Sequence, residues 1–546
     1  MRSSTPRRRV SAILRTLLAA SAWTGAAAVC AGESTQPRVL DGRFDDWTNQ
    51  APALVDPADA ARAPIDIGAV WVADDPAALH LAIELGRQVN LQALDGILHL
   101  LIDTDGNAAT GETQYGLVGT DVIISFSASH PKSPNRPGRG VGVRRLGVAG
   151  AATSTPYDLG VAFAPTAAAR RAEIVVPRGS FSGGPDLLTG ETCALKFVFV
   201  GADGTLLDET DVISHRFGSA AGPTPPAELS KDPLARRQDT LRVVTWNVER
   251  GALIKTPEAF ARVLRALEPD VLLFQELTSK ESAAQIAAWL EEHVPQAPSA
   301  EPAGESGGEP SASPSPRSWR VVFGAGGGDL RTAVASRVPL EDAAGLGTVA
   351  WHDTKERGGP RDVRFAGGVV EFGGRRVLFA STHLKCCGSI DSEEDLVRLE
   401  EVQALRSSLR GFDFGDASAA GRSSGSRVEA FVIGGDFNLV GSFDPLDLLV
   451  EGIDRDGTDL GIADALQLDR RTNATWEDPG QPFTPGRLDY IVFTDSTFQA
   501  VGAFVFDTRD LLPQHLEAHG LRVADTGDAS DHLPVVVDFA WRAARP

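Results

Sequence analysis

The chain has 546 residues, a net charge of −21 and 42% apolar residues, including 9 Trp and 24 Phe. This length predicts more than one domain, and the apolar content is that of globular domains and excludes a wholly disordered chain. The strong negative charge excludes general adhesion to nucleic acid, which needs a basic surface. It leaves open a local site where a divalent metal supplies positive charge.

Residues 1–31 are typical of a secretory signal peptide. Three arginines at 7–9 precede small and apolar residues at 17–29, and Val29-Cys30-Ala31 offers a cleavage site. A membrane anchor is the alternative, but Arg15 interrupts the run and a span needs about 20 apolar residues. A lipoprotein signal at Cys30 is another alternative, but Val29 fits such a signal poorly. We therefore expect a secreted or periplasmic protein.

Cleavage after Ala31 would leave an odd number of cysteines, namely Cys193, Cys386 and Cys387. An odd number cannot pair completely within one chain, so no disulfide framework holds the fold. The adjacent Cys386 and Cys387 are predicted either to form a strained vicinal bridge or to be free and buried thiols.

Residues 37–220 are predicted to form an all-β sandwich. Apolar side chains alternate at 79–85 and 195–199, and further short apolar runs lie at 67–72, 97–102, 122–126 and 174–176. No stretch of helical length has a strong helical pattern, and many short strands are typical of a sandwich. The basic, Gly- and Pro-rich residues 130–145 are predicted to form a solvated loop.

A turn in this first domain is a candidate calcium site. Asp103, Asp105 and Asn107 place three oxygen-bearing side chains at alternate positions around a glycine, and hard cations prefer several such oxygens. The pattern lacks the glutamate and flanking helices of an EF-hand, so a polar hairpin turn explains it equally well. Asp121 is a further candidate ligand.

Two stretches of this domain, DGRFDDW at 41–47 and IDTDGN at 102–107, resemble the carbohydrate-binding-module family 9-like sandwiches. The resemblance implies a glycan or cell-surface ligand and a structural Ca²⁺. Trp47 and Trp71 could stack on a sugar ring, although core packing is the more typical role for Trp47.

Three segments have linker-like or loop-like composition. Residues 221–240 are rich in Pro, Ala and charged residues and are predicted to link two domains. Residues 296–318 and 416–427 are rich in small and polar residues without apolar periodicity, so we expect disordered insertions within the second domain, 241–546.

Polar residues lie at the ends of six strand-like runs in the second domain. At 431–439, an apolar run and two glycines precede Asp436 and Asn438, which alternation places on one side of an extended segment. An Asx turn would explain this pair alone. The other ends carry Asn247, Glu276, His383, Asp489 and Asp531-His532. Because sites form where strand ends converge, we expect one site.

The six stretches in order are TWNV (245–248), FQE (274–276), THL (382–384), GGDFN (434–438), RLDY (487–490) and SDHLPV (530–535). Together they resemble the endonuclease/exonuclease/phosphatase family, the DNase-I-like metal-dependent phosphoesterases. The resemblance covers 241–546 and implies a four-layer α/β sandwich, two sheets face to face with helices outside. We therefore expect a multidomain fold, an N-terminal all-β sandwich followed by this α/β sandwich.

The resemblance also implies a catalytic metal. Asn247, Glu276 and Asp531 are predicted to hold Mg²⁺ or Mn²⁺, because carboxylate and amide oxygens suit hard divalent ions. Glu276 is the expected chief ligand, since an unpaired acid at the end of an apolar strand would be costly without a cation.

Five further residues are predicted to act on the substrate. His383 and His532 would donate hydrogen bonds to the phosphate, and Asp489 would fix the tautomer of His532. Asp436 would orient or deprotonate the attacking water, and Asn438 would hold a phosphate oxygen. Taken singly, each has a structural explanation as a cap or a core residue.

Residues 392–410 are predicted to form an amphipathic helix with Leu396, Leu399, Val402 and Leu405 on its apolar face. Its Arg398 could face the site, but we expect it at the solvated surface. Lys385 is a candidate phosphate contact, with a solvated lysine as the alternative.

The expected activity is that of a secreted, divalent-metal-dependent phosphodiester hydrolase, with nucleic acid as the preferred substrate and a monomer as the expected state. The alternatives are a sphingomyelinase-type lipid phosphodiesterase, a small-substrate phosphatase and a catalytically silent binding protein. The acidic charge weighs against a nuclease, the lack of an apolar hairpin against a lipid enzyme, and the complete residue set against a silent protein.

Overall fold

The computed structural model describes residues 38–543, except for 61, 128–138, 148–153, 180–185, 219–230, 296–317, 344–345, 347–348, 352–360 and 413–426. The signal peptide expected at 1–31 lies outside the described residues, as do nearly all of the insertions expected at 296–318 and 416–427. None of the described helices is long and apolar enough to cross a membrane.

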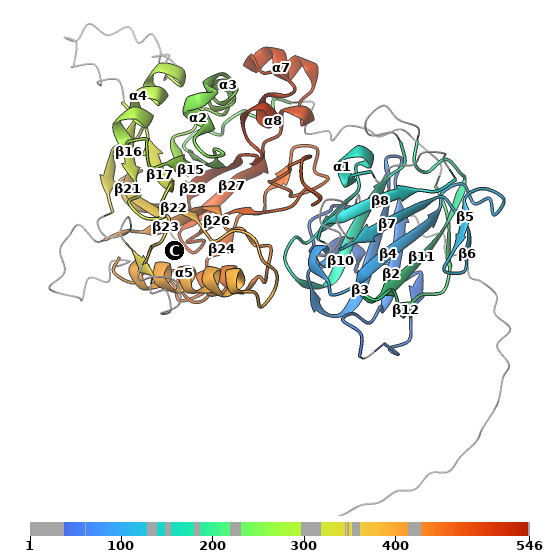
Figure 1. The fold of residues 1–546 in the computed structure, drawn as a ribbon. Helices are drawn as coiled ribbons and strands as arrows, with labels where there is room; N and C mark the ends of the chain where they lie inside the picture. Colours follow the sequence, from blue (N-terminus) through green and yellow to red (C-terminus); the bar gives the residue numbers. More distant parts are fainter. Residues whose placement is uncertain are drawn as a thin grey trace, which may run out of the picture. The chain divides into compact units, whose positions relative to one another are not determined.

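The N-terminal region consists mostly of β-strands in two antiparallel sheets (Figure 1). The first sheet contains, in spatial order, β1 (Leu54–Val55), β2 (Ala69–Asp74), β3 (Ala78–Val89), β10 (Ala169–Pro177) and β9 (Ala162–Ala164). The second contains β12 (Leu206–Glu209), β11 (Thr192–Val200), β4 (Ile97–Asp103), β7 (Val122–Phe126) and β8 (Val141–Arg145), with β13 (Ile213–Arg216) also on β11. The described N-terminal residues also form a small hairpin, β5 (Glu112–Gln114) and β6 (Leu117–Thr120), a short helix, α1 (Pro156–Leu159), and two 3-10 helices at Asp45–Trp47 and Leu91–Ala93.

Apolar side chains from both of these sheets share one core. Ile83 of β3 and Ile174 of β10 meet Leu100 of β4 and Phe197 of β11 in it, and all four are fully buried. The prediction of a solvated loop at 130–145 is wrong for its last residues, because Val141–Arg145 form strand β8 and pair with β7. The alternation of Val141 and Val143, both buried, is the signal for that strand.

Two sheets also form the C-terminal region. The first contains, in spatial order, β16 (Arg320–Phe323), β17 (Leu330–Ser336), β15 (Val271–Thr278), β14 (Leu241–Asn247), β28 (Val535–Trp541), β27 (Phe498–Val505) and β25 (Leu466–Gln467). The second contains β18 (Leu340–Asp342), β21 (Phe365–Phe372), β22 (Arg375–His383), β23 (Ala430–Asp436), β26 (Asp489–Phe493) and β24 (Gly461–Ile462). A two-stranded ladder joins β19 (Ala350–Trp351) to β20 (Arg361–Asp362).

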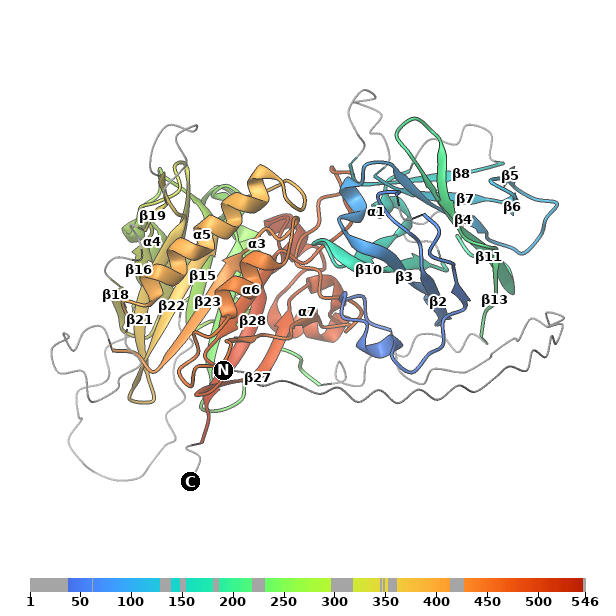
Figure 2. The ribbon, with the colours of Figure 1, turned by 90° about the horizontal axis from the view of Figure 1, so that it is seen from below.

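The two sheets pack face to face with helices outside, so the predicted four-layer α/β sandwich is confirmed (Figures 1 and 2). Leu273 and Val243 of the first sheet meet Val432 and Ile491 of the second in the central core. The helices α2 (Ala252–Lys255), α3 (Pro257–Leu267), α4 (Ala283–His293), α7 (Pro513–His519) and α8 (Asp525–Ala529) cover the first sheet, and α5 (Glu393–Leu409) and α6 (Asp444–Val450) cover the second.

The two glycines of the GGDFN stretch are required by close packing. A Cβ atom on Gly434 would lie 2.8 Å from Leu273 Cδ1 of the facing sheet. A Cβ on Gly435 would lie 1.9 Å from the carbonyl oxygen of Thr382 on the neighbouring strand. Only glycine lets β23 approach so closely, and this places Asp436 beside β22.

Of the linker expected at 221–240, residues 231–240 are described. Leu234 is buried in the core under α3, and its carbonyl oxygen accepts a hydrogen bond from Arg242 Nη1 at 3.0 Å. Arg236 forms an ion pair with Asp270. The end of this segment therefore packs on the α/β region.

Hydrogen bonds also join the N-terminal strands to the α/β region within one compact unit, Gln36–Pro546. Asn90 Nδ2 donates to the carbonyl oxygens of Val440, at 3.0 Å, and Gly441, at 3.2 Å. Asn90 Oδ1 accepts the amide of Ile390 at 2.7 Å.

Candidate active site

The polar strand ends of the α/β region converge at one place. In the second sheet, His383 is paired in register with Asp436, and Asp436 with Asp489. In the first sheet, β14 ends at Asn247, which is paired with Gln275 beside Glu276. Side-chain contacts between Asn247 and Asp436 then connect the two sheets.

His532 and Asp489 form a buried pair at this site. Nδ1 of His532 lies 2.8 Å from Oδ2 of Asp489, so the other ring nitrogen, Nε2, faces the site, 3.8 Å from Asp436 Oδ2. Burial lowers the pKa of His532, but the carboxylates of Asp489 and Asp436 outweigh it and raise this pKa to about 10. His532 is therefore an imidazolium at neutral pH.

Asp436 is the hub of the site. Its Oδ2 accepts hydrogen bonds from Asn247 Nδ2 at 3.1 Å and Asn438 Nδ2 at 3.0 Å, and its Oδ1 accepts the Asn438 amide at 2.9 Å. Burial raises the pKa of Asp436 to about 8; the charge of His532 opposes this shift, and the nearby acids Asp489 and Glu276 add to it. Asn438 has a left-handed φ of 50°, and the resulting turn directs its amide back to Asp436.

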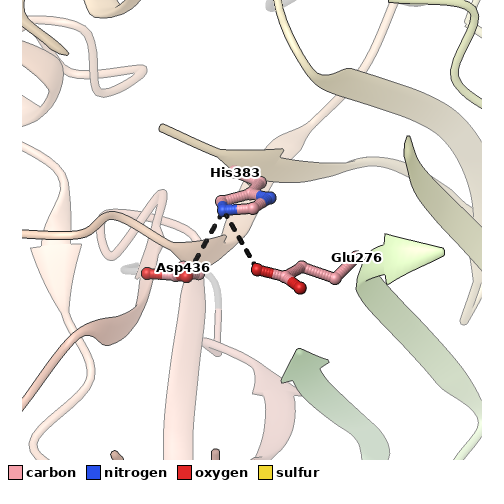
Figure 3. Close-up of side chains that lie close together, drawn as sticks. All are labelled: Glu276, His383 and Asp436. Atoms are coloured by element: carbon pink, nitrogen blue, oxygen red, sulfur yellow. Dashed lines mark ion pairs between the residues drawn. The ribbon is translucent and has the colours of Figure 1, made fainter. Parts of the chain in front are cut away.

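Glu276 and His383 form the other side of the site. Figure 3 shows a ring nitrogen of His383 directed between the carboxylates of Glu276 and Asp436; Nε2 lies 3.8 Å from Glu276 Oε1 and 3.6 Å from Asp436 Oδ2. Burial and the positive charge of Arg364 lower the pKa of His383 well below its usual value, so this imidazole is neutral. A bulge in β15 places Glu276 at φ 58°, with Oε2 accepting the Arg250 amide at 3.1 Å.

This set of donor atoms fits a divalent cation. Ligand atoms of Glu276, His383 and Asp436 lie within 4.8 Å of one another, and the imidazole in this group is the neutral one. Within the described part of the chain, Asp489 Oδ1 is buried and has no hydrogen-bond partner. Carboxylates held this close repel one another, and a bound cation would relieve that repulsion.

Two of the three predicted metal ligands are placed differently from Glu276. The Asn247 amide has its nitrogen toward Asp436, while its oxygen accepts the Glu249 amide at 3.1 Å, so it would have to turn over to act as a ligand. Asp531 lies beside the acidic cluster, where its Oδ2 accepts a hydrogen bond from Trp476 Nε1 at 3.0 Å.

Three residues of the site were not found from the sequence. Arg364 Nη1 lies 3.2 Å from His383 Nδ1, and its Nη2 donates to the Leu384 carbonyl at 3.1 Å. Thr475 Oγ1 donates to Asp489 Oδ2 at 2.7 Å, and Trp476 binds Asp531. These residues precede or lie between strands in segments without apolar periodicity, so no sequence signal marks them.

The prediction that Arg398 is solvated is wrong. Arg398 is fully buried; its Nη1 donates to the carbonyl oxygens of Lys385 and Cys387 at 2.8 and 2.7 Å, and its Nη2 pairs with Asp395 Oδ1 at 2.9 Å. Helix α5 therefore turns a charged pair inward, and Leu396, expected on the apolar face, is 55% exposed.

The candidate calcium turn is held by its own hydrogen bonds. Asp103 Oδ1 accepts the amide of Gly106 at 2.8 Å, Asp105 Oδ1 accepts the amide of Asn107 at 2.9 Å, and Asn107 Oδ1 accepts the amide of Ala109 at 3.1 Å. Carboxylate oxygens of Asp103, Asp105 and Asp121 also lie within 4.8 Å of one another. Both explanations fit this turn, so calcium binding stays a prediction.

Acidic and histidine side chains at the converging strand ends of two facing sheets form a candidate active site. Residues 244–532, more than half of the chain, match the model of the Endonuclease/Exonuclease/phosphatase family. The chain therefore belongs to this family, whose members are phosphoesterases and nucleases, as its six stretches predicted.

Solved structures are similar at low identity. A family protein from Leptotrichia buccalis is 13% identical with a TM-score of 0.32, covering 56% of this chain and 100% of its own. The 3′ phosphatase NExo from Neisseria is 16% identical with a TM-score of 0.32, covering 55% and 100%. An AP endonuclease from Archaeoglobus fulgidus is 15% identical with a TM-score of 0.30, covering 54% and 98%. The search of curated protein sequences found no match.

Proposed function

We propose that this protein hydrolyses phosphodiester bonds in nucleic acid with the help of Mg²⁺ or Mn²⁺. The observation that carries the proposal is the arrangement around Asp436. A charged His532, fixed by Asp489, faces Asp436 on one side, and Glu276 and neutral His383 face it on the other.

His532 is suited to stabilise negative charge on the phosphoryl group. An imidazolium donates from both ring nitrogens, and the Nδ1 donor is already occupied by Asp489. The Nε2 donor is therefore available to a phosphoryl oxygen, and such charge-assisted hydrogen bonds strengthen as charge develops on the oxygen.

Asp436 is suited to orient the attacking water and accept its proton. A general base works best when its pKa is near the operating pH, and burial holds the pKa of Asp436 at about 8. Asn438 orients both carboxylate oxygens of Asp436, because its backbone amide donates to Oδ1 and its side-chain amide donates to Oδ2. The same side-chain amide also donates to the Leu384 carbonyl at 3.1 Å. The base therefore keeps one orientation.

Glu276 is the residue assigned to hold the cation, together with Asn247 once its amide is turned over and Asp531 from the edge of the site. The bound cation supplies neutralisation of charge on the phosphoryl oxygens. Arg364 and Lys385 add fixed positive charge near His383, which lowers the pKa of that imidazole. These cations favour an anionic substrate within an otherwise acidic chain.

The same proposal includes export of the protein and a glycan- or surface-binding role for the N-terminal strands. Export rests on the signal-like residues 1–31. The glycan role rests on the sequence resemblance and on Trp71, which is half-buried, whereas Trp47 is buried and donates to Glu173 at 2.8 Å. Detection of the protein outside the cells of a native host tests export. Comparison of the wild type with Trp71→Ala on a glycan array tests the binding role.

A substrate panel tests the proposed reaction. DNA, RNA, sphingomyelin, inositol phosphates and a chromogenic diester are incubated with Mg²⁺, Mn²⁺ or a chelator. We expect metal-dependent cleavage of DNA or RNA, abolished in His532→Ala and kept in the control His519→Ala, whose imidazole pairs with Asp232 on another surface. Hydrolysis of sphingomyelin or phosphomonoesters alone would replace the nuclease proposal.

A further inference from the structure

Two adjacent thiols lie side by side next to the candidate active site. Sγ of Cys387 is 3.0 Å from Sγ of Cys386, and Nζ of Lys385 is 3.8 Å from the latter. Both cysteines are free, but the expectation that they are buried is wrong, because Cys387 is exposed and Cys386 is half-buried. Cys193 lies in the core of the N-terminal strands, so a small molecule in solution can reach the pair from the side of Cys387 but cannot reach Cys193.

The backbone of this turn is held firmly from beneath. Arg398 Nη1 donates to the carbonyl oxygens of Lys385 and Cys387, and the Lys385 amide donates to buried Glu401 at 2.7 Å. Cys387 has a left-handed φ of 73°, which is strained for a residue with a Cβ. Within this turn, Cys387 is the exposed residue and Cys386 is half-buried.

This turn directly follows Leu384, whose backbone is hydrogen-bonded to residues of the active site. The Leu384 amide donates to the Asp436 carbonyl at 2.9 Å, and the Leu384 carbonyl accepts from Asn438 and Arg364, each at 3.1 Å. We therefore expect a change in the backbone at Lys385–Cys387 to reach the residues that orient Asp436 and contact His383.

We propose that Cys386 and Cys387 form a redox-modification site, at which a small-molecule disulfide converts the dithiol to a vicinal disulfide and thereby disturbs the adjacent active site. The chemical part of this inference is independent of the proposed function. Only its effect on turnover rests on that function.

The reaction is a thiol–disulfide exchange. The Cys386 thiolate attacks one sulfur of the small disulfide, forming a mixed disulfide and releasing one thiolate. The Cys387 thiol then gives its proton to solvent, attacks Cys386 Sγ and releases the second thiolate. Two protein thiols are oxidised and one disulfide is reduced to two thiols. The hydrogen bond from Cys387 and the charge of Lys385 lower the pKa of Cys386 to about 5 despite burial, so the attacking thiolate is present at neutral pH.

The product is expected to be strained and therefore readily reversed. Neighbouring Cα atoms are about 3.8 Å apart across a trans peptide, whereas ordinary disulfides join Cα atoms about 4.4–6.8 Å apart. Strained, exposed disulfides are the easily reduced, regulatory ones. Ring closure must rotate residues whose carbonyl groups Arg398 holds, so the Leu384 carbonyl moves with them.

The test treats the reduced full-length chain with oxidised glutathione and compares it with four variants, Cys193→Ala, Cys386→Ser, Cys387→Ser and the double variant. Peptide mass spectrometry follows the pair, and amide hydrogen exchange follows residues 383–390 and 436–440. We expect loss of two hydrogens from the 386–387 peptide in the wild type and Cys193→Ala, reversed by dithiothreitol. Cys387→Ser should instead retain glutathione on Cys386, and the double variant should not react.

Oxidation should change exchange in both segments and lower the hydrolysis rate about 10-fold or more, because small displacements of catalytic groups are costly. An unreactive pair, or a wild type that retains glutathione, would overturn the site. A closed disulfide with unchanged exchange at 436–440 would overturn its link to the active site. If no substrate is hydrolysed, the mass and exchange results still decide the inference separately from the proposed function.

Discussion

In this site, the charge state of a side chain depends on its neighbours and not on its residue type alone. His383 and His532 both follow or precede strands, yet one imidazole is neutral because it is buried beside Arg364, and the other is charged because it is held between Asp489 and Asp436. Two histidines, one neutral and one positively charged, can serve different tasks in one reaction.

Removal of the Glu276 charge should abolish most activity. Glu276→Gln keeps the shape of the side chain but loses a carboxylate assigned to the cation, so we expect a decrease of at least ~10² in kcat/KM, about 3 kcal/mol of barrier. Steady-state kinetics at saturating Mg²⁺ measures it, and Glu371→Gln, an exposed site on β21, is the matched control. Wild-type turnover in the variant would refute the assignment.

His532 and Asp489 should act as one unit. His532→Ala is expected to lower the rate by ~10²–10⁴, the usual range for a positioned acid–base group. Asp489→Asn should be costly alone but add little to His532→Ala, since residues that act together are not additive. A double-mutant cycle at fixed metal concentration measures this, and fully additive losses would mean that Asp489 acts elsewhere.

The raised pKa of His532 also predicts how stability depends on pH. Its folded-state pKa of about 10 exceeds the ordinary value of 6.5, so its contribution is complete below pH 6.5 and is lost as the pH rises through about 10. Urea unfolding in chelator should show stability falling across this window, and falling less steeply in Asp489→Asn. Equal slopes in the two proteins would contradict the pairing.

At the scale of elements, helix α5 connects packing to the site. Its sequence has an apolar period, yet its buried face also carries Asp395, Arg398 and Glu401. These charged groups are buried because they bind one another and the carbonyl and amide groups of the turn that follows β22. A charged pair can be buried when its polar atoms find partners, and Nε of Arg398 is the one atom of this pair that has none among the described residues.

Removing one partner of that pair should destabilise the α/β region. Arg398→Met leaves Asp395 buried without its cation and frees two carbonyl groups, so we expect a loss of about 3–5 kcal/mol in the free energy of unfolding. Urea unfolding followed by Trp fluorescence measures it. Arg410→Met, an exposed change at the end of the same helix, should alter stability by less than ~0.5 kcal/mol. Equal stability of the two variants would show that the pair is dispensable.

At the scale of the molecule, the start of the α/β region determines how it can be isolated. Shortened chains beginning at Asp239 and at Lys231 should both fold and hydrolyse soluble substrates. The longer one keeps Leu234 in the core and its hydrogen bond to buried Arg242, so we expect it to be more stable by ~2–4 kcal/mol.

Both shortened chains lack the Asn90 hydrogen bonds, so the difference in stability between them does not include that loss. Thermal and urea unfolding measure the difference in stability. If both chains fold but neither hydrolyses substrates that the full chain cleaves, the N-terminal strands are part of the catalytic unit.

Much of this arrangement was determined by the sequence alone. Continuous apolar runs bounded by glycines and polar residues defined the central strands, and the polar residues at their ends defined Asn247, Glu276, His383, Asp436 and His532 as one group. These signals are local, since strand patterns and turn residues depend on a few neighbours in the chain.

The tertiary structure decided the rest. Arg364 and Thr475 reach the site from segments without a pattern, Arg398 turns inward, and Asp531 binds Trp476 at the edge of the cluster. Each of these outcomes depends on partners distant in sequence, and the pairing of buried polar groups with such partners leaves no periodic trace in the chain.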